Sequence, residues 1–309
     1  MRLMHLNEEI GFDSPAQISF ISHAHSDHLG GLKSDRIIAS AETIALCGIS
    51  KKSENIKGTR MIEAGHILGA RQFVLENDNK IIYTGDISLK NNIFGFKAKI
   101  EECDRLIIES TYASPEYQFE DPSLVYEQIA KWIKENEYAN IIIGAYELGK
   151  SQEIARVLNE YCGIAPIISD KCEDFCAVYE SFGFKIDRIV VGTEEAEEEM
   201  NHPFVAIVPM RFAKRSFAKK IESAFGSKTL VAVATGWALK FRYNVDNVFA
   251  LSDHADFNDL LFYIEQSGAK EIEFFEGDGS ALLNHLKSTS SVLVGNMSSA
   301  RRLITYKKI

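Results

Sequence analysis

His23-Ala24-His25-Ser26-Asp27-His28 follows the apolar run Ile18 to Ile21 and carries three imidazoles and one carboxylate within six residues. In an extended segment His23 and His25 point to the same side, because side chains alternate with period two. The turn marked by Gly30-Gly31 can then bring Asp27 and His28 back beside them. Nitrogen and oxygen donors gathered in this way are suited to zinc or a similar divalent ion. The segment therefore predicts a metal site where a strand ends.

Two later turns supply further donors. His66 lies in a turn flanked by glycines, and Asp86 follows the short apolar strand that begins at Ile81. Taken alone, each residue is typical of an ordinary loop or turn. With the first segment they complete a two-metal set: His23, His25 and His66 for one ion, Asp27 and His28 for the second, and Asp86 as the bridge. Two ions about 3.5–4 Å apart activate water near neutral pH and clamp a phosphoryl group.

The pattern His23-x-His25-x-Asp27-His28, followed by His66 and Asp86, resembles that of the metallo-β-lactamase superfamily. Asp13 is similar to the early structural aspartate of that superfamily, which orients the site. Three further segments resemble the β-CASP branch of RNA- and DNA-processing nucleases: Arg105 to Tyr112, Tyr146 to Glu153, and Leu251 to Asp256. The stretch Ala234 to Trp237, together with Ser252 to Asp256, looks most like ligase-associated exonucleases, and the whole set is also similar to mRNA 3′-end processing factors.

The resemblance implies an α/β fold, in which a metallo-β-lactamase αββα sandwich carries an inserted β-CASP α/β cap domain. We expect residues 1–113 and 247–309 to form the first domain and residues 114–246 to form the cap. The pattern of the chain agrees, because short apolar segments such as Arg71 to Leu75 alternate with helical ones. Pro122 to Glu135 predicts a helix, with Asp121 as its N-cap. Alternation between Ile141 and Ala234 predicts a parallel sheet.

The implied activity is hydrolysis of phosphodiester bonds in RNA or DNA, by an exonuclease or a 3′-end-processing endonuclease. His254 would be the general acid, Glu109 would orient it, and Asp27 would serve both metal binding and catalysis. A histidine is well suited to deliver a proton near neutral pH, and an acidic partner fixes its ring. The alternative for His254 is a position at a helix start among capping aspartates. A non-catalytic protein, or a hydrolase of the same fold with another substrate, also remains open.

The chain departs from the β-CASP pattern at one position. RNA-active members carry a His-Gly after the strand that follows the second histidine motif, and that histidine binds the second metal. Here the strand Ile272 to Phe275 is followed by Glu276-Gly277. A carboxylate can ligate zinc or manganese, so Glu276 is a second-site ligand or a solvated strand end. We expect two divalent ions, zinc foremost, with manganese as the alternative at the second site.

Gly144 to Ser151 matches the P-loop pattern Gly-x4-Gly-Lys-Ser after a strand, which makes nucleotide binding a third hypothesis. Against it, Glu147 would repel the phosphates that such a loop cradles. The β-CASP resemblance explains the same letters without ATP. Gly149, Lys150 and Ser151 are expected to contact a nucleic-acid phosphate, since a helix N-terminus attracts anions.

The net charge of −10 over 309 residues argues against non-specific coating of nucleic acid. Positive charge gathers at Arg211, Lys214 and Arg215, whose spacing predicts a basic helical face with interleaved aromatics. This face is either a contact for single-stranded RNA or DNA or a solvated helix. The five irregularly spaced cysteines indicate a reducing compartment, and no apolar run reaches a membrane span. We expect a cytoplasmic protein whose oligomeric state the sequence leaves open.

Overall fold

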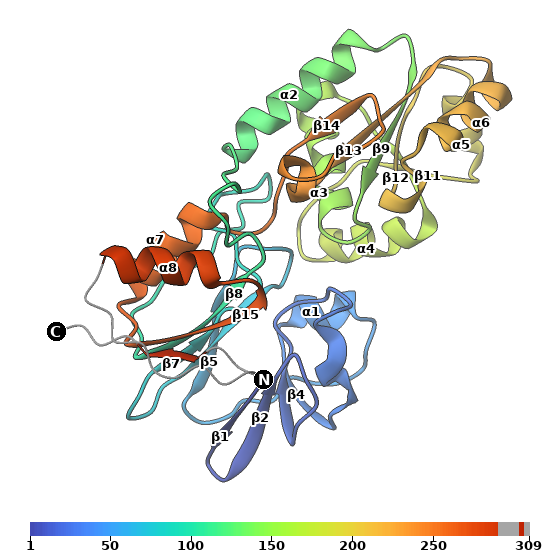
Figure 1. Cartoon of the computed structure of the whole chain (residues 1–309). Coiled ribbons are helices and arrows are strands. Elements are labelled where there is room, and N and C mark those ends of the chain that lie inside the picture. The colour runs from blue at the N-terminus through green and yellow to red at the C-terminus, as the bar shows by residue number, and fades with distance from the viewer. Residues whose placement is uncertain (290–302, 306–309) are drawn as a thin grey trace. The chain divides into compact units, whose positions relative to one another are not determined.

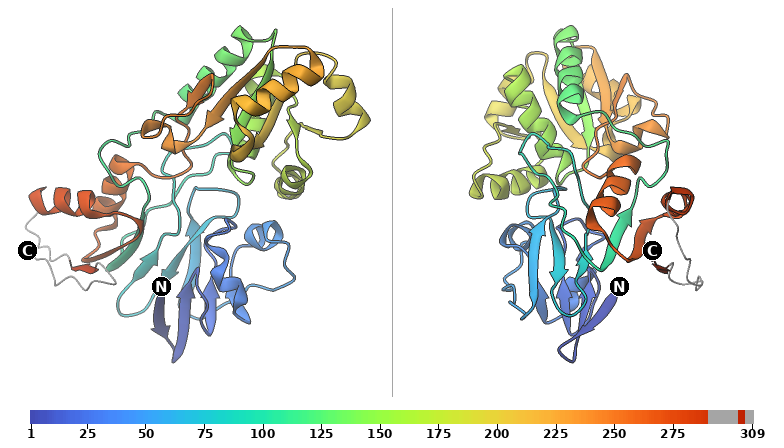
Figure 2. Two further views of the ribbon diagram at one scale, coloured as in Figure 1. Left: turned by 45° about the vertical axis from the view of Figure 1, so that its right-hand side comes forward. Right: turned by 90° about the vertical axis from the view of Figure 1, so that its left-hand side faces the viewer.

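The computed structural model describes residues 1–289 and 303–305, and the chain divides into two compact units (Figures 1 and 2). Unit 1 comprises Met1–Asn91, Phe96–Gln118 and His254–Ile309, and unit 2 comprises Asn92–Gly95 and Phe119–Asp253. Residues 290–302 and 306–309, which the sequence assigned to the first domain, lie outside the described residues. Each unit is a mixture of strands and helices, so the expected α/β class is confirmed.

Unit 1 contains two sheets. The first has the order β1-β2-β3-β4, with strands Arg2–His5, Glu8–Phe12, Ile18–Phe20 and Arg36–Ile38. The second has the order β16-β15-β8-β7-β6-β5; in chain order from β5 its strands are Thr59–Glu63, Arg71–Leu75, Ile81–Tyr83, Arg105–Ser110, Glu271–Gly277 and Leu303–Thr305. Their apolar faces share one core, in which Phe12 stacks on Tyr83 with ring centroids 4.5 Å apart. The shared core fixes the strand ends that carry the site.

The helices of unit 1 follow its strands. Their bounds are Leu29–Lys33 for η1, Ala41–Leu46 for α1, Phe257–Ser267 for α7 and Ser280–Thr289 for α8. The α7 helix packs against β8 and is capped by Asp256, whose carboxylate accepts hydrogen bonds from the backbone N–H groups of Asn258 and Asp259. Lys90 holds the same carboxylate, with its Nζ 2.5 Å from Asp256 Oδ2. These contacts fix the chain just after His254.

Unit 2 is built on one sheet of order β11-β10-β12-β9-β13-β14, and every pairing in it is parallel. From β9 to β14 its strands are Asn140–Ala145, Ile167–Ile168, Ile189–Val190, Val205–Pro209, Thr229–Ala234 and Asn247–Phe249. The helices, α2 to α6, are Pro122–Glu135, Lys150–Val157, Asp170–Ser181, Glu194–Glu199 and Arg215–Phe225, with shorter helical turns at η2 (Leu158–Cys162), η3 (Met210–Phe212) and η4 (Gly236–Leu239). The parallel sheet predicted for this stretch is confirmed.

The helix predicted at Pro122 to Glu135 has those bounds, and the Asp121 side chain accepts a hydrogen bond from the Ser123 backbone N–H as its cap. Its buried residues, among them Val125, Ile129 and Ile133, recur at helical spacing and form its inner face. Across residues 1–289 and 303–305, no helix combines the length and the apolar character that crossing a lipid bilayer requires.

Candidate metal centre

Four residues of unit 1 bring one ligand atom each to a common point. They are His23, His25, His66 and Asp86, and these atoms all lie within 4.8 Å of one another. The two histidines of the first turn follow β3, His66 lies between β5 and β6, and Asp86 follows β7. Three of the four are almost fully buried, and His25 is half-buried. The first ligand group expected from the sequence is therefore assembled in space; it is called the first donor group below.

Asp27, His28 and Glu276 form a second donor group on the same criterion. Glu276 Oε1 lies 3.2 Å from His28 Nε2, and Asp27 Oδ2 lies 4.0 Å from the same nitrogen. His28 is buried, whereas the carboxylates of Asp27 and Glu276 are 72% and 41% exposed. The second group is thus open to solvent on its carboxylate side.

Asp86 lies between the two groups. Its Oδ2 is 3.4 Å from His23 Nε2, 3.7 Å from His66 Nε2 and 3.5 Å from His28 Nε2. Burial raises the pKa of Asp86 well above its usual value, so its ionised form needs positive charge close by. This position agrees with the bridging role expected from the sequence.

Buried atoms without a partner test whether the site fits metal ions. Within the described part of the chain, His23 Nε2, His28 Nε2 and Asp86 Oδ1 are buried and find no hydrogen-bond partner. Leaving such atoms unsatisfied is costly, and most buried polar atoms in proteins are paired. Divalent cations at the two donor groups would coordinate these atoms. Imidazole nitrogens and carboxylate oxygens are ligands that zinc accepts, so the donor set fits.

Asp13 fixes the ring of His28 through its Nδ1, the ring nitrogen that does not face the other donors. Its Oδ2 accepts hydrogen bonds from His28 Nδ1 at 2.8 Å, Tyr83 OH at 2.8 Å and Ser22 Oγ at 2.7 Å, while Oδ1 accepts from the Ser22 backbone N–H at 2.7 Å. A proton on His28 Nδ1 leaves the lone pair on Nε2, which faces the other donors. Asp13 has a positive φ of 47°. Sequence reasoning found Asp13 but missed Ser22 and Tyr83, which no motif marks.

The two buried histidines differ in charge preference. Burial, reinforced by the neighbouring histidines, lowers the pKa of His23, which is then neutral as a metal ligand must be. Burial also opposes protonation of His28, but the hydrogen bond to Asp13 and the nearby carboxylates of Glu276 and Asp86 outweigh it and raise the pKa of His28 to about 12. The surroundings of His28 therefore favour a positive charge, which a proton or a metal cation can supply.

The position of Glu276 depends on an irregularity in β15. The pairing of β15 with β8 shifts between Phe275 and Gly277, and Glu276 has a φ of 49°. Such a bulge re-aims a side chain, and a positive φ at a residue other than glycine is unfavourable unless its surroundings impose it. Gly277 is required beside it, because a Cβ there would lie 2.1 Å from the Ser110 carbonyl oxygen. The bulge turns Glu276 toward His28.

Half-buried His254 and fully buried Glu109 form a pair next to the donor groups. His254 Nδ1 lies 2.9 Å from Glu109 Oε2 and 3.2 Å from Oε1, and Glu109 also accepts a hydrogen bond from the Ile87 backbone N–H. The other ring nitrogen, His254 Nε2, is 3.9 Å from Asp86 Oδ2. Because α7 begins after Asp256, His254 precedes the helix and is not one of its first residues. The carboxylate orients the imidazole toward the donor groups.

The phosphate contacts expected at Gly149, Lys150 and Ser151 require correction. The Gly149 backbone N–H donates to Gln152 Oε1 at 2.7 Å, and Ser151 donates both its backbone N–H and its hydroxyl to the Tyr146 carbonyl oxygen. Lys150 is 1% exposed, and its Nζ lies 2.5 Å from Glu153 Oε2. These donors are engaged within unit 2, which argues against the expected phosphate contacts at these three residues.

The predicted basic face also requires correction. The α6 helix begins at Arg215, whereas Arg211 lies in η3 and Lys214 is extended. The three side chains therefore do not share one face of a helix. The Arg211 guanidinium lies over the Phe212 ring at 4.8 Å, and Arg215 forms an ion pair with Asp246 at 2.9 Å. The prediction from spacing was wrong because Ala213 and Lys214, between the η3 turn and α6, do not have helical backbone angles.

Comparison with known proteins finds relatives but no matching family model. The chain is 30% identical over 287 residues to a probable DNA ligase of Opitutus terrae, covering 85% of this chain and 27% of that protein. It is 30% identical over 189 residues to an RNase J-like protein of Methanocaldococcus jannaschii, covering 48% and 45%. It is 34% identical over 106 residues to the endoribonuclease ysh-1 of Neurospora crassa, covering 32% and 12%. The chain thus spans less than half the length of each of these relatives.

Proposed function

Because the chain belongs to the metallo-β-lactamase superfamily and to its β-CASP branch, we propose that it is a metal-dependent nuclease that hydrolyses phosphodiester bonds in single-stranded RNA or DNA. One observation carries the proposal: two donor groups converge on Asp86, and His254 and Glu109 lie beside them. A phosphodiester needs charge stabilisation, an activated water and a proton for the leaving oxygen. The residues at this site are suited to all three needs.

His23, His25, His66 and Asp86 would hold one divalent cation, and Asp86 would share the second with Asp27, His28 and Glu276. When bound, the two cations stabilise negative charge on the phosphoryl group and lower the pKa of water. We propose zinc at the first donor group. At the second, Glu276 supplies a carboxylate, which accommodates zinc or the harder manganese ion.

His254 would hold the proton that the leaving oxygen takes up, at its Nε2. Glu109, fully buried and bonded to Nδ1, fixes the ring and stabilises its protonated form. Asp27 contributes an exposed carboxylate that can bind metal and orient water at the open side of the second donor group. Asp13 positions His28 and does not reach the reacting atoms.

We also propose that unit 1 is the αββα sandwich of the family and that unit 2 is its β-CASP cap, with the boundaries 1–113, 247–309 and 114–246. The support is the division of the chain into compact units that change at Gln118 and Asp253, close to these positions. The cytoplasmic location expected from the cysteine pattern stays a prediction.

The relatives support two substrates. Two of them are named for RNA cleavage, and one, the probable DNA ligase, for joining DNA. We therefore keep both RNA and DNA as substrates, cut by an exonuclease or a 3′-end-processing endonuclease. A non-catalytic protein, or a hydrolase of thioesters or lactams, is the alternative that the experiment below separates.

The test combines metal analysis with cleavage of end-labelled single strands. The purified protein should contain close to two divalent ions per chain, and it should degrade labelled RNA or DNA when supplied with zinc or manganese but not after chelation. Failure to cut either strand with either metal would overturn the proposal. One ion per chain with activity retained would instead show that Glu276 does not complete the second donor group.

A further inference from the structure

Residues 237–243, within the connection between β13 and β14, are called the aromatic loop below; basic and aromatic side chains alternate in its second half, from Lys240 to Tyr243. Its sequence is Trp237-Ala238-Leu239-Lys240-Phe241-Arg242-Tyr243. Phe241 is 53% exposed and Leu239 is 43% exposed, and both cations are exposed. Trp237 and Tyr243 are half-buried. Large apolar side chains that are exposed together in one patch mark a binding surface.

Both ends of the aromatic loop are anchored to the sheet. Before it, the Thr235 backbone N–H donates to the Phe249 carbonyl oxygen at 3.0 Å, and Thr235 Oγ1 accepts from the Trp237 backbone N–H at 3.3 Å. After it, the backbone N–H of Asp246 donates to the Val231 carbonyl oxygen at 2.7 Å. The loop therefore presents its rings from a fixed base.

The rings gather at one edge of unit 2. Trp237 and Phe241 have centroids 5.8 Å apart, at an interplanar angle of 47°. Tyr146, 50% exposed, follows the end of β9, the strand that pairs with β13. All three aromatic residues therefore follow the carboxyl ends of two adjacent parallel strands. In open parallel sheets this is the edge where ligands bind.

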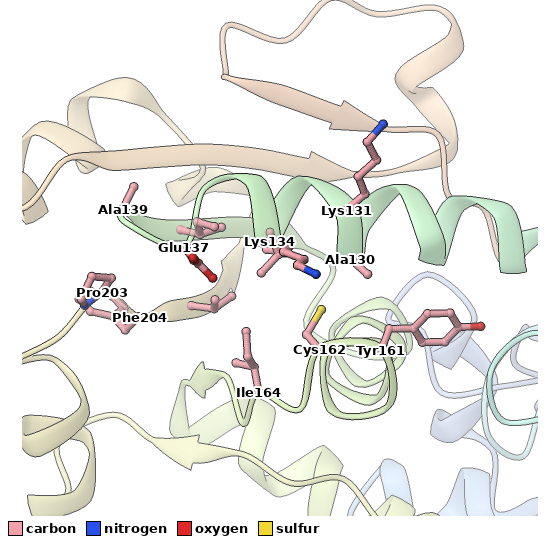
Figure 3. A pocket seen from close by; sticks show the side chains of 13 residues that line it. Ala130, Lys131, Lys134, Glu137, Ala139, Tyr161, Cys162, Ile164, Pro203 and Phe204 are labelled. Carbon is pink, nitrogen blue, oxygen red and sulfur yellow. The ribbon is translucent and has the colours of Figure 1, made fainter.

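The opposite edge of the same sheet serves as a comparison. A cavity of about 550 Å³ lies at the amino ends of β9 and β12 (Figure 3). Its charged lining residues are Lys131, Lys134 and Glu137, and Tyr161 contributes the one phenolic ring. Acid and base are mixed there, and the aromatic and basic residues do not alternate along one segment. The amino edge therefore lacks the combination of unmixed positive charge and neighbouring aromatic rings that favours binding of a polyanion.

Charge and ring chemistry together identify the ligand. Lys240 and Arg242 flank Phe241 in the sequence, and no ion pair of Arg242 is found within residues 1–289. A surface that combines cations with exposed rings fits single-stranded nucleic acid, because phosphates neutralise the cations and unpaired bases stack on the rings. A double strand would keep its bases away from such rings.

We propose that the aromatic loop and Tyr146 form a binding face for single-stranded nucleic acid, with bases stacked on Trp237 and Phe241 and phosphates held by Lys240 and Arg242. This proposal rests on the proposed nuclease function and adds the surface of unit 2 that holds the strand. Stacking on any base is sequence-tolerant, so the face should bind RNA and DNA of mixed sequence.

The test is fluorescence anisotropy of a labelled 20-nucleotide single strand, with the full chain in chelator so that no cleavage occurs. Phe241→Ala should weaken binding roughly tenfold, the scale of losing one stacked base. Arg242→Gln should weaken binding and lower the slope of log affinity against log salt by about 0.7, as expected for one phosphate contact on a single strand.

Matched controls come from the amino edge of the same sheet. Tyr138 is 60% exposed, and Lys228 Nζ lies 5.7 Å from its ring centroid. Tyr138→Ala and Lys228→Gln remove the same kinds of side chain and should leave the affinity within twofold of the wild type. Thermal unfolding of all four variants checks that they fold.

Equal affinities for the loop variants and the controls would overturn the proposal, and would leave a protein partner as the occupant of the aromatic loop. The proposed function is tested separately. The assay measures whether the wild-type protein hydrolyses bis(p-nitrophenyl) phosphate with added zinc or manganese. That small diester has no neighbouring nucleotides to engage the loop. Hydrolysis without strand binding at the loop would therefore reject the inference and keep the nuclease, whereas no hydrolysis would reject the nuclease.

Discussion

The turn His23–His28 and the loop Gly144–Ser151 look equally suited to bind a ligand in the sequence, yet they differ in the structure. Each follows an apolar strand, and each matches a known binding pattern. In the first, His23 Nε2 and His28 Nε2 are buried without hydrogen-bond partners among the described residues. In the second, the polar groups of Gly149, Lys150 and Ser151 are bonded within unit 2.

The difference shows what a motif needs before it becomes a site. Buried polar atoms in a folded protein are normally paired, so several metal-ligating atoms that converge without a partner indicate the place of a cation. Lys150 occupies the lysine position of the P-loop pattern, but its ammonium lies 2.5 Å from Glu153 and 3.8 Å from Asp253. Its role is to neutralise buried carboxylates, and this explains the Gly-Lys-Ser letters without a nucleotide.

The largest expected effect concerns His254, beside the donor groups. His254→Ala should lower cleavage of a labelled single strand by about 10²- to 10⁴-fold, the range for losing a general acid. The metal content should stay at the wild-type value, because the first and second donor groups are intact. Metal analysis and single-turnover cleavage measure the two quantities on one preparation. Retained activity would remove His254 as the acid, and lost metal would make it a ligand.

The second prediction concerns Lys150. Lys150→Met leaves Glu153 buried without its cation, so the free energy of unfolding should fall by about 3–5 kcal/mol. Lys171→Met is the matched control, because Lys171 is 62% exposed in its ion pair with Glu147 and should contribute less than about 1 kcal/mol. Urea unfolding measures both. Neither protein should bind ATP in calorimetry, and saturable binding by the wild type that Lys150→Met abolishes would restore the P-loop hypothesis.

The same contrast separates what the sequence could predict from what it could not. The Pro122–Glu135 helix and the β6 strand, Arg71–Leu75, have the predicted bounds, because cap, proline and apolar spacing are local signals. The first donor group was predictable for a related reason, since turns that follow strands place its four residues. Chain-wide contacts decided the rest. The burial of Lys150 and the role of Tyr83, whose hydroxyl reaches Asp13 across 70 residues of sequence, follow only from packing.

At Glu276 the sequence pattern predicted a ligand or a solvated strand end, and the tertiary structure places the side chain near His28. Substitution of Glu276 gives the smallest expected effect of the three. Its carboxylate is 41% exposed, and its Oε1 lies 3.2 Å from His28 Nε2. Glu276→Gln keeps the shape and removes the charge. The affinity for the second ion should therefore fall roughly tenfold, at the lower end of the range for changes around metal ligands. The first ion, held by the first donor group, should remain.

Metal titration after dialysis against a weak chelator measures the affinity of the Glu276→Gln variant for each of the two ions. Zinc and manganese are compared separately. Glu271→Gln is the control, because Glu271 lies at the other end of β15 and belongs to neither donor group. If Glu276→Gln binds two ions as tightly as Glu271→Gln, the carboxylate is a solvated strand end, and its left-handed backbone only accommodates the bulge. If only the affinity for the second ion falls, and falls more for manganese than for zinc, the charge of Glu276 sets the metal preference at the second donor group. The reason is that a harder ion depends more strongly on carboxylate oxygen.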